Sequence, residues 1–168
     1  MKPYEQVLAS LDGLNIKYEL ARHEKVKSIA ECAVCEKLLG ALMPRNIFLC
    51  TKNQSVFCLL VAHPESIFRT SSVSKQAGTS RLSFAPEEKI SLLLNTYSGA
   101  VSPLGLMFDF EHKVRLLMDE RLKDEEFLLF HPLDNTMSVK IQTNDLIKTV
   151  IPYFGHKTEW VCLESQEE

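Results

Sequence analysis

Residues 45–62, RNIFLCTKNQSVFCLLVA, contain two apolar runs separated by a short polar segment. The two runs, 47–51 and 56–62, are rich in the β-branched and aromatic residues that favour strands. The link between them, residues 52–55, contains the Asn and Ser side chains that are typical of turns. This stretch therefore predicts a β-hairpin, and the elements on either side of it indicate the fold class.

Upstream of the hairpin the apolar pattern has helical spacing. Val7, Leu8 and Leu11 recur at that spacing, and Gly13 provides a stop signal for the first helix. The predicted helices are 3–14, 28–39, 71–76, 86–94 and 143–153. Pro86 is expected at the first position of the fourth helix, and Thr143 is expected to cap the fifth. The predicted strands outside the hairpin are 17–21, 104–108, 114–118, 126–130, 137–141 and 160–163.

Strands in meanders, with helices at the start, middle and end of the chain, are typical of the α+β class with a mixed sheet. The chain has 168 residues, of which 45% are hydrophobic, and this is the size and apolar content of one ordinary domain. We therefore predict a single domain over residues 1–164 and a disordered acidic tail over residues 165–168.

The composition of the chain indicates its cellular compartment and the chemical state of its cysteines. No apolar run reaches the ~18 residues of a membrane-spanning helix, and no signal peptide is recognisable, so we expect a soluble, cytoplasmic protein without a membrane partner. Five cysteines, an odd number, favour reduced thiols over a disulfide framework. Cys32 and Cys35 have the spacing of a metal or redox pair. However, Ser28 and Glu31 have the spacing of a helix capping box, which favours two ordinary helix cysteines.

The net charge of −3 hides an uneven distribution of charge along the chain. Residues 45–85 carry five basic side chains against Glu65 alone, a balance of +4 that leaves −7 for the remainder. A locally basic segment raises the expectation of an RNA partner only modestly, because such segments also occur on ordinary solvated surfaces. The five basic residues are Arg45, Lys52, Arg69, Lys75 and Arg81.

Three short stretches join a strand-like run to polar, Gly or Pro residues. They are residues 45–49 (RNIFL), 99–103 (GAVSP) and 130–136 (FHPLDNT). Each can place a polar group at the rim of a sheet, where loops carry chemistry. We therefore expect the three stretches to form one site.

These stretches, in this order, resemble those of the freestanding prolyl-tRNA editing proteins of the YbaK/ProX family, which hydrolyse misacylated tRNA. The resemblance covers about residues 4–163 and includes the runs ARH, RLSFA and HKV at 21–23, 81–85 and 112–114. It implies a fold like the prolyl-tRNA synthetase editing domain, a curved, mixed and largely antiparallel sheet flanked by helices. The RNIFL, RLSFA and FHP runs look more like the branch that deacylates Ala-tRNA(Pro) than the Cys-tRNA(Pro) branch. One position departs from the pattern, because the family usually has Lys where this chain has Arg45.

Hydrolysis of an aminoacyl ester needs a positioned water, donors for the developing oxyanion and a pocket for the amino-acid side chain. The sequence contains neither a Gly-x-Ser-x-Gly elbow nor a metal-ligand motif, so we predict a reaction without a covalent serine, a metal or a cofactor. Gly99 permits close backbone approach in the GAVSP loop, and Pro103 stiffens this loop. The N–H groups of Ala100, Val101 and Ser102 are then candidate oxyanion donors, and a plain turn is the alternative.

The other candidates are polar side chains beside predicted strands. His131 ends a strand and precedes Pro132, so it could orient water, bind the ribose or hold the loop, and His63 is the second choice among the histidines. The resemblance implies that Asn46 positions the substrate and that Arg45 neutralises phosphate or the tRNA 3′ end. The alternatives are a structural histidine and an Asn that caps a strand.

The resemblance implies a trans-editing deacylase that acts on Ala-tRNA(Pro), with the 3′ acceptor end of tRNA and prolyl-tRNA synthetase as partners and no DNA partner. The terminal adenosine could stack on Phe48, Phe84 or Phe130, although their apolar neighbours favour a core position for all three. Two other functions stay open. One is the editing of another small amino acid, Ser or Cys, and the other is a regulator that binds an aminoacyl group without turnover.

Overall fold

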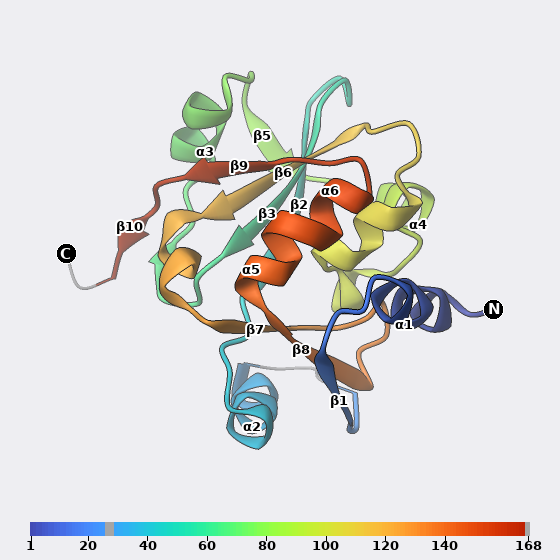
Figure 1. Cartoon of the computed structure of the whole chain (residues 1–168). Helices are drawn as coiled ribbons and strands as arrows, with labels where there is room; N and C mark the ends of the chain where they lie inside the picture. Colours follow the sequence, from blue (N-terminus) through green and yellow to red (C-terminus); the bar gives the residue numbers. More distant parts are fainter. Residues whose placement is uncertain (26–28, 167–168) are drawn as a thin grey trace.

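The computed structural model describes residues 1–25 and 29–166, and its centre is a five-stranded mixed sheet with the order β5-β2-β3-β6-β9 (Figure 1). The strands are β5 (Leu82–Phe84), β2 (Arg45–Thr51), β3 (Phe57–Ala62), β6 (Val114–Asp119) and β9 (Thr158–Val161). β2 pairs antiparallel with β3 and β5, whereas β6 pairs parallel with β3 and β9. The predicted hairpin is therefore confirmed, and its open end places Arg45 opposite Ala62.

A second sheet has three antiparallel strands in the order β1-β8-β7, which are Tyr18–Arg22, Met137–Gln142 and Phe127–Phe130. Two short strands, β4 (Ser66–Ile67) and β10 (Glu164–Ser165), form a separate antiparallel pair. The predicted α+β class with a mixed, largely antiparallel sheet is confirmed, with its strands divided among these sheets.

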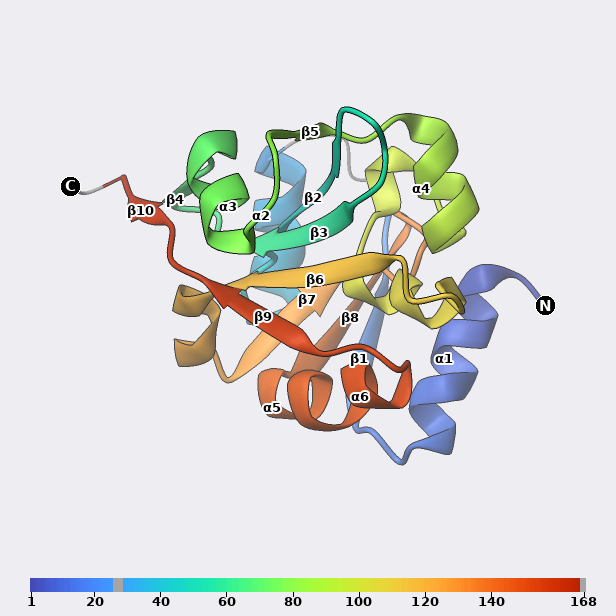
Figure 2. The same ribbon diagram turned by 90° about the horizontal axis from the view of Figure 1, so that it is seen from above.

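Helices cover the sheets on both sides (Figures 1 and 2). The α-helices are α1 (Pro3–Gly13), α2 (Ile29–Leu39), α3 (Thr70–Ala77), α4 (Glu87–Leu94), α5 (Thr143–Asp145) and α6 (Ile151–Tyr153), and η4 (Leu146–Val150) is a π-helical segment between the last two. The 3₁₀ turns are η1 (Ser98–Ala100), η2 (Pro103–Phe108) and η3 (Glu120–Asp124). Within the described ranges no helix combines the length and the apolar character needed to cross a membrane.

The strands β2 and β3 have continuous apolar sequences because both faces of the central sheet are buried. Phe48 and Cys50 face the larger core, which also contains α1, α4 and the three-stranded sheet. Ile47 and Leu49 face a smaller core that contains Val73 of α3. Successive residues of a strand point to opposite faces, so a strand between two cores needs apolar side chains on both.

Residues 104–108 were the main error of the sequence prediction, because they form the 3₁₀ helix η2 instead of a strand. Ser102 caps this helix, since its hydroxyl accepts a hydrogen bond from the Leu104 N–H at 3.2 Å. Pro103 occupies the first position, where its fixed φ favours a helical turn. These two local signals outweigh the strand-like apolar composition that follows them.

At the starts of two helices, the N-cap differs from the prediction by one residue. Gln142, and not Thr143, is the N-cap of α5, and the Thr143 hydroxyl is buried without a hydrogen-bond partner in the described part of the chain. Pro86 is the N-cap of α4 and not its first residue. The caps were misplaced because side-chain type alone does not fix where the helical φ/ψ values begin.

The ordered part of the chain extends into the predicted acidic tail. Ser165 lies in β10 opposite Ser66, and the Gln166 N–H donates to the Glu65 carbonyl at 3.3 Å. The disorder predicted for residues 165–168 therefore does not hold at its first two positions. Residues 167–168 and the predicted capping residue Ser28 lie outside the described residues.

Candidate functional site

A cleft of about 400 Å³ lies between α2, the start of β2, the β3–β4 turn, η1 and the end of β7. It brings together residues from each of the three stretches that the sequence singled out. Arg45 and Asn46 come from the first stretch, Gly99 and Val101 from the second, and His131 from the third. The stretches therefore meet at one place, although they are far apart in the sequence.

The other walls of the cleft come from helix α2, which the sequence did not connect with the site, and from the turn that carries His63, the second choice among the histidines. Helix α2 contributes Ala33 and Glu36, and the β3–β4 turn contributes His63. The Glu36 carboxylate accepts a hydrogen bond from the Met43 N–H at 3.0 Å, which ties α2 to the segment before β2. The side chain of Cys32 lies outside the described residues, and Cys35 is buried in α2.

His131 follows the last residue of β7 and is 8% exposed. Its Nδ1 lies 2.7 Å from the Met137 carbonyl oxygen, and because a carbonyl can only accept, Nδ1 carries the proton. Burial lowers the pKa of the imidazole below its ordinary value, the hydrogen bond to Met137 opposes this, and the neighbouring His23 lowers the pKa further. The ring is therefore neutral near pH 7 and presents Nε2 as a hydrogen-bond acceptor.

Asn46 presents a buried oxygen without a donor. Its Nδ2 donates to the Pro44 carbonyl at 3.4 Å, whereas Oδ1 has no hydrogen-bond partner among residues 1–25 and 29–166. A buried acceptor left unpaired costs about 1–3 kcal/mol, so this oxygen favours an incoming donor such as an ammonium group. Arg45 is exposed beside it, and its guanidinium forms no ion pair with any described side chain.

Residues 99–103, here called the Gly99 loop, differ from the expected arrangement. The Ala100 N–H donates to the Tyr97 carbonyl at 2.9 Å within η1, so it is already occupied and is not a free oxyanion donor. Ser102 and Pro103 are buried as the cap and first residue of η2 and do not line the cleft. Of this loop, Gly99 and Val101 are the predicted residues that reach the cleft.

A hydrogen-bonded pair joins the Gly99 loop to the loop after His131. The Tyr97 hydroxyl donates to Asn135 Oδ1 at 2.9 Å and accepts from the Asn135 N–H at 3.0 Å. Asn135 Nδ2 lies 3.2 Å from the place that a Cβ on Gly99 would occupy. Asn135 belongs to the 130–136 stretch but had no predicted role, and Tyr97 was not predicted at all, because an Asn in a turn and a Tyr near a Gly are common. Only the fold shows that the two residues meet.

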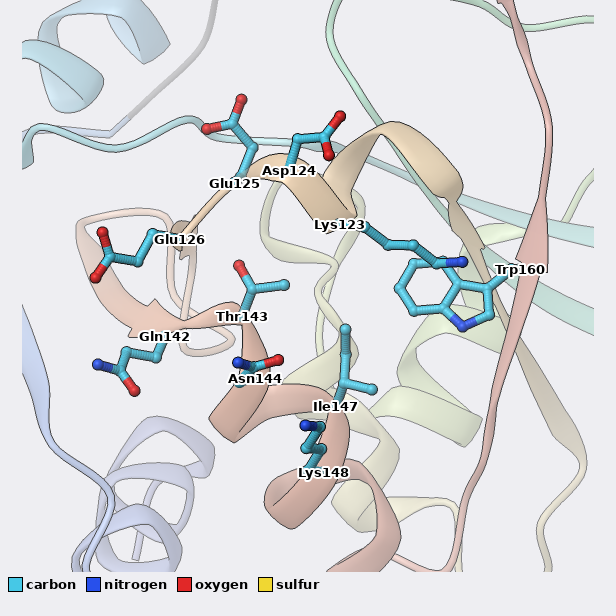
Figure 3. A pocket seen from close by; sticks show the side chains of 10 residues that line it. All are labelled: Lys123, Asp124, Glu125, Glu126, Gln142, Thr143, Asn144, Ile147, Lys148 and Trp160. Atoms are coloured by element: carbon cyan, nitrogen blue, oxygen red, sulfur yellow. The ribbon is translucent and has the colours of Figure 1, made fainter.

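A separate hollow of about 450 Å³ lies where η3, β9 and the start of α5 come together (Figure 3). Five of the ten residues that line it are charged, and Lys123 Nζ lies 4.4 Å from the centroid of the Trp160 ring. None of the predicted site residues lines this hollow. The hollow lies at the start of β7, next to Glu126, whereas His131 lies just past the end of that strand. The candidate site is therefore the cleft at His131.

Other sequence expectations are only partly met. Phe48 and Phe130 are core residues, as favoured, but Phe84 is 71% exposed and does not line the cleft. Arg45 and Lys52 lie at opposite ends of β2, with Lys52 just past its last residue. The basic segment of the sequence therefore does not form a single patch around the cleft.

The comparisons with known proteins agree with this fold. The model of the aminoacyl-tRNA editing domain matches residues 23–149. The prolyl-tRNA editing protein ProX of Acetoanaerobium sticklandii is 30% identical over 150 residues, which is 89% of this chain and 92% of that protein. The prolyl-tRNA synthetase associated domain-containing protein 1 of Danio rerio is 27% identical over 140 residues, which is 82% of this chain and 76% of that protein.

Among solved structures, one described as a proposed trans-editing enzyme for prolyl tRNA synthetase aligns with a TM-score of 0.71 and 12% identity over 98% of each chain. At that identity the likeness shows a shared fold. The family model and the relatives, in contrast, match along most of the sequence. The chain therefore belongs to the aminoacyl-tRNA editing domain family, together with the prolyl-tRNA editing protein ProX.

Proposed function

We propose that the chain is a trans-editing deacylase that hydrolyses the ester of misacylated Ala-tRNA(Pro). The observation that carries the proposal is the meeting, in one open cleft, of a neutral His131, the unpaired Asn46 oxygen and the Gly99 loop. Family membership supports editing chemistry, and the 30% identity to a prolyl-tRNA editing protein supports tRNA(Pro) as the carrier. The name of the Danio rerio relative supports prolyl-tRNA synthetase as the enzyme whose errors are corrected.

The proposed roles follow from the hydrogen-bonding capacity of each group. Asn46 Oδ1 accepts a hydrogen bond from the α-ammonium group of the esterified alanine. His131 Nε2 accepts one from the attacking water and directs its oxygen at the carbonyl carbon. The N–H groups of Gly99 and Val101 stabilise the developing oxyanion, a contribution of about 2.7–4 kcal/mol for each such donor in a well-studied case.

In the reaction, the water oxygen bonds to the carbonyl carbon, and the bond from that carbon to the ribose oxygen then breaks. The ribose oxygen takes up one proton of the water, the other proton passes to the solvent, and alanine leaves with a free carboxylate. A separate editing step makes physical sense, because a synthetase site built for proline rejects a smaller side chain by only about 1–3 kcal/mol.

The proposal is tested with purified protein and preformed Ala-, Ser-, Cys- and Pro-tRNA(Pro). We expect release of alanine well above the buffer rate, little release of proline, and a loss of rate in His131→Ala. Failure to release any amino acid would overturn the deacylase proposal. Faster release of serine or cysteine than of alanine would keep the reaction and change the substrate.

Arg45 favours a second candidate, a protein that binds an aminoacyl group without turnover. The planar guanidinium cannot simply replace the compact ammonium that the family usually has at this position. This candidate predicts that a non-hydrolysable alanyl-adenosine analogue binds, that turnover is absent, and that Arg45→Lys restores it. Full turnover by the unaltered protein excludes this candidate.

A further inference from the structure

The β3–β4 turn brings a second histidine into the cleft, and its ring is fixed in one tautomer. His63 directly follows β3 and lines the cleft together with Asn46 and His131. The Glu65 backbone N–H donates to His63 Nδ1 at 3.1 Å. Since Nδ1 accepts this bond, the proton of the neutral ring must be on Nε2.

A buried carboxylate fixes the turn that carries this ring. Asp119, the last residue of β6, is 0% exposed. Its Oδ2 accepts from the His63 N–H at 3.0 Å and from the Ser66 hydroxyl at 2.5 Å, and its Oδ1 accepts from the Arg121 N–H at 3.1 Å. The Ser66 N–H also donates to the His63 carbonyl at 3.0 Å. The backbone of a turn held by such a network keeps its position when a ligand arrives, and the Glu65 N–H holds the ring itself.

The two histidines of the cleft therefore have opposite hydrogen-bonding characters. His131 uses Nδ1–H to bind Met137 and presents Nε2 as an acceptor. His63 uses Nδ1 as an acceptor for Glu65 and presents Nε2–H as a donor. A cleft with a fixed acceptor and a fixed donor can recognise a ligand that carries both kinds of group.

We infer that His63 contacts the substrate and that its Nε2–H donates a hydrogen bond to an oxygen of the terminal ribose. This inference rests on the proposed function. The ammonium group and the attacking water call for acceptors, which Asn46 and His131 supply, and the oxyanion faces the backbone of the Gly99 loop. The acceptors of the ester that stay unmatched are the ribose oxygens. One of them gains negative charge as the ester bond breaks, so a donor there helps more in the transition state than in the ground state.

Two amide variants of His63 separate this role from a purely structural one. In His63→Asn the side-chain oxygen can still accept from the Glu65 N–H, but the side chain is too short to reach the position of Nε2. In His63→Gln an amide N–H reaches about that position, but the acceptor for Glu65 is displaced. Each variant therefore keeps one of the two hydrogen bonds and removes the other.

We expect His63→Asn to lower kcat/KM for Ala-tRNA(Pro) by about 5- to 100-fold, as for a substrate group left without its donor, and His63→Gln to recover most of that loss. Both variants should keep the melting temperature within a few degrees of that of the unaltered protein. The reverse order, an active Asn variant and an impaired Gln variant, would show that His63 only holds the turn and would overturn the inference.

A binding measurement keeps the inference testable apart from turnover. The probe, called the ribose probe, is an amide-linked, non-hydrolysable 3′-alanylamino-adenosine, which keeps the 2′-hydroxyl of the ribose as an acceptor. His63→Asn should bind the ribose probe several-fold more weakly than the unaltered protein. Equal binding, together with equal turnover, overturns the inference and leaves the proposed function standing. If the unaltered protein neither hydrolyses Ala-tRNA(Pro) nor binds the ribose probe, both fail.

Discussion

The neutral state of His131 determines how the site should respond to pH. Burial lowers the pKa of this ring below its ordinary value of about 6.5, so the free Nε2 persists from that pH upward. As the pH falls through the lowered pKa, protonation removes the acceptor that we propose orients the water. The catalytic rate should therefore be flat from about pH 6.5 to 8 and fall on the acidic side.

This prediction is checked by single-turnover deacylation, with the buffer rate subtracted at each pH because the ester itself hydrolyses faster in base. The His131→Ala variant is the control, and its residual rate should lack the acidic decline. An enzymatic rate that keeps climbing between pH 6.5 and 8 would mean that another group limits the reaction.

The Tyr97–Asn135 pair is a second feature whose effect should be visible at a single residue. Tyr97→Phe removes the hydroxyl and leaves the Asn135 N–H and Oδ1 without their partner. We expect the free energy of unfolding to fall by about 1–3 kcal/mol. We also expect kcat to fall more than KM changes, because the Gly99 loop is no longer hydrogen-bonded to the loop after His131. Tyr153→Phe is the matched control, since Tyr153 is 65% exposed and should change stability by less than about 0.5 kcal/mol. Urea denaturation that gives equal stability for both variants would contradict this.

At the scale of elements, the sequence predicted what periodicity and turn chemistry determine. The hairpin and the strands β6, β7 and β8 are close to their expected positions, because apolar runs bounded by polar turns specify strands locally. Residues 104–108 were misassigned because their composition suits a strand, whereas Ser102 and Pro103 begin a 3₁₀ helix before it. The contact between Tyr97 and Asn135 depends on how η1 packs beside the β7–β8 loop, and no local pattern records it.

The start of α5 offers a test of a buried polar group. Thr143 is 5% exposed, and its hydroxyl has no partner in the part of the chain that the structure describes. Thr143→Val removes a desolvated hydroxyl at nearly constant volume, so it should leave stability unchanged or raise it by up to about 1 kcal/mol. Thr51 is also buried, at 2%, but its hydroxyl donates to Asn53 Oδ1 at 2.9 Å and accepts from the Val56 N–H at 3.2 Å. Thr51→Val should therefore destabilise by about 1–3 kcal/mol.

Thermal or urea unfolding of the two Thr→Val variants decides the point, and each serves as the control for the other. A clear loss of stability in Thr143→Val would show that its hydroxyl has a partner in solution. Such a result would return Thr143 to the capping role that the sequence predicted for it.

For the molecule as a whole, the sequence predicted which stretches meet better than it predicted the detailed structure of each stretch. The three stretches do meet at one cleft, but the backbone donor expected at Ala100 is already bonded, and Ser102 and Pro103 lie beneath the surface. His63, Asp119 and Asn135 depend on contacts between strands and turns that are distant in sequence. The order of residues along a chain shows which groups sit at strand ends, and only the packed fold shows which of those ends face each other.

The charge distribution leads to a prediction about RNA binding. The net charge is −3, and Arg45 and Lys52 of the 45–85 segment lie at opposite ends of β2, so attraction to tRNA should depend on a few local contacts. Arg45 is exposed at the cleft, whereas Arg81 is exposed but does not line it. If Arg45 contacts a phosphate of the single-stranded 3′ end, its loss should reduce the slope of log affinity against log salt by about 0.7.

Titrations of uncharged tRNA(Pro) at several salt concentrations would measure this slope for Arg45→Ala and for the matched control Arg81→Ala. We expect the shallower slope only in Arg45→Ala. Arg45→Lys should keep the original slope, because the charge remains, while changing the deacylation rate if the planar fork of the guanidinium has a role beyond charge. Equal slopes for all variants would show that the tRNA does not meet Arg45, and the phosphate contact would then have to be sought elsewhere on the rim of the cleft.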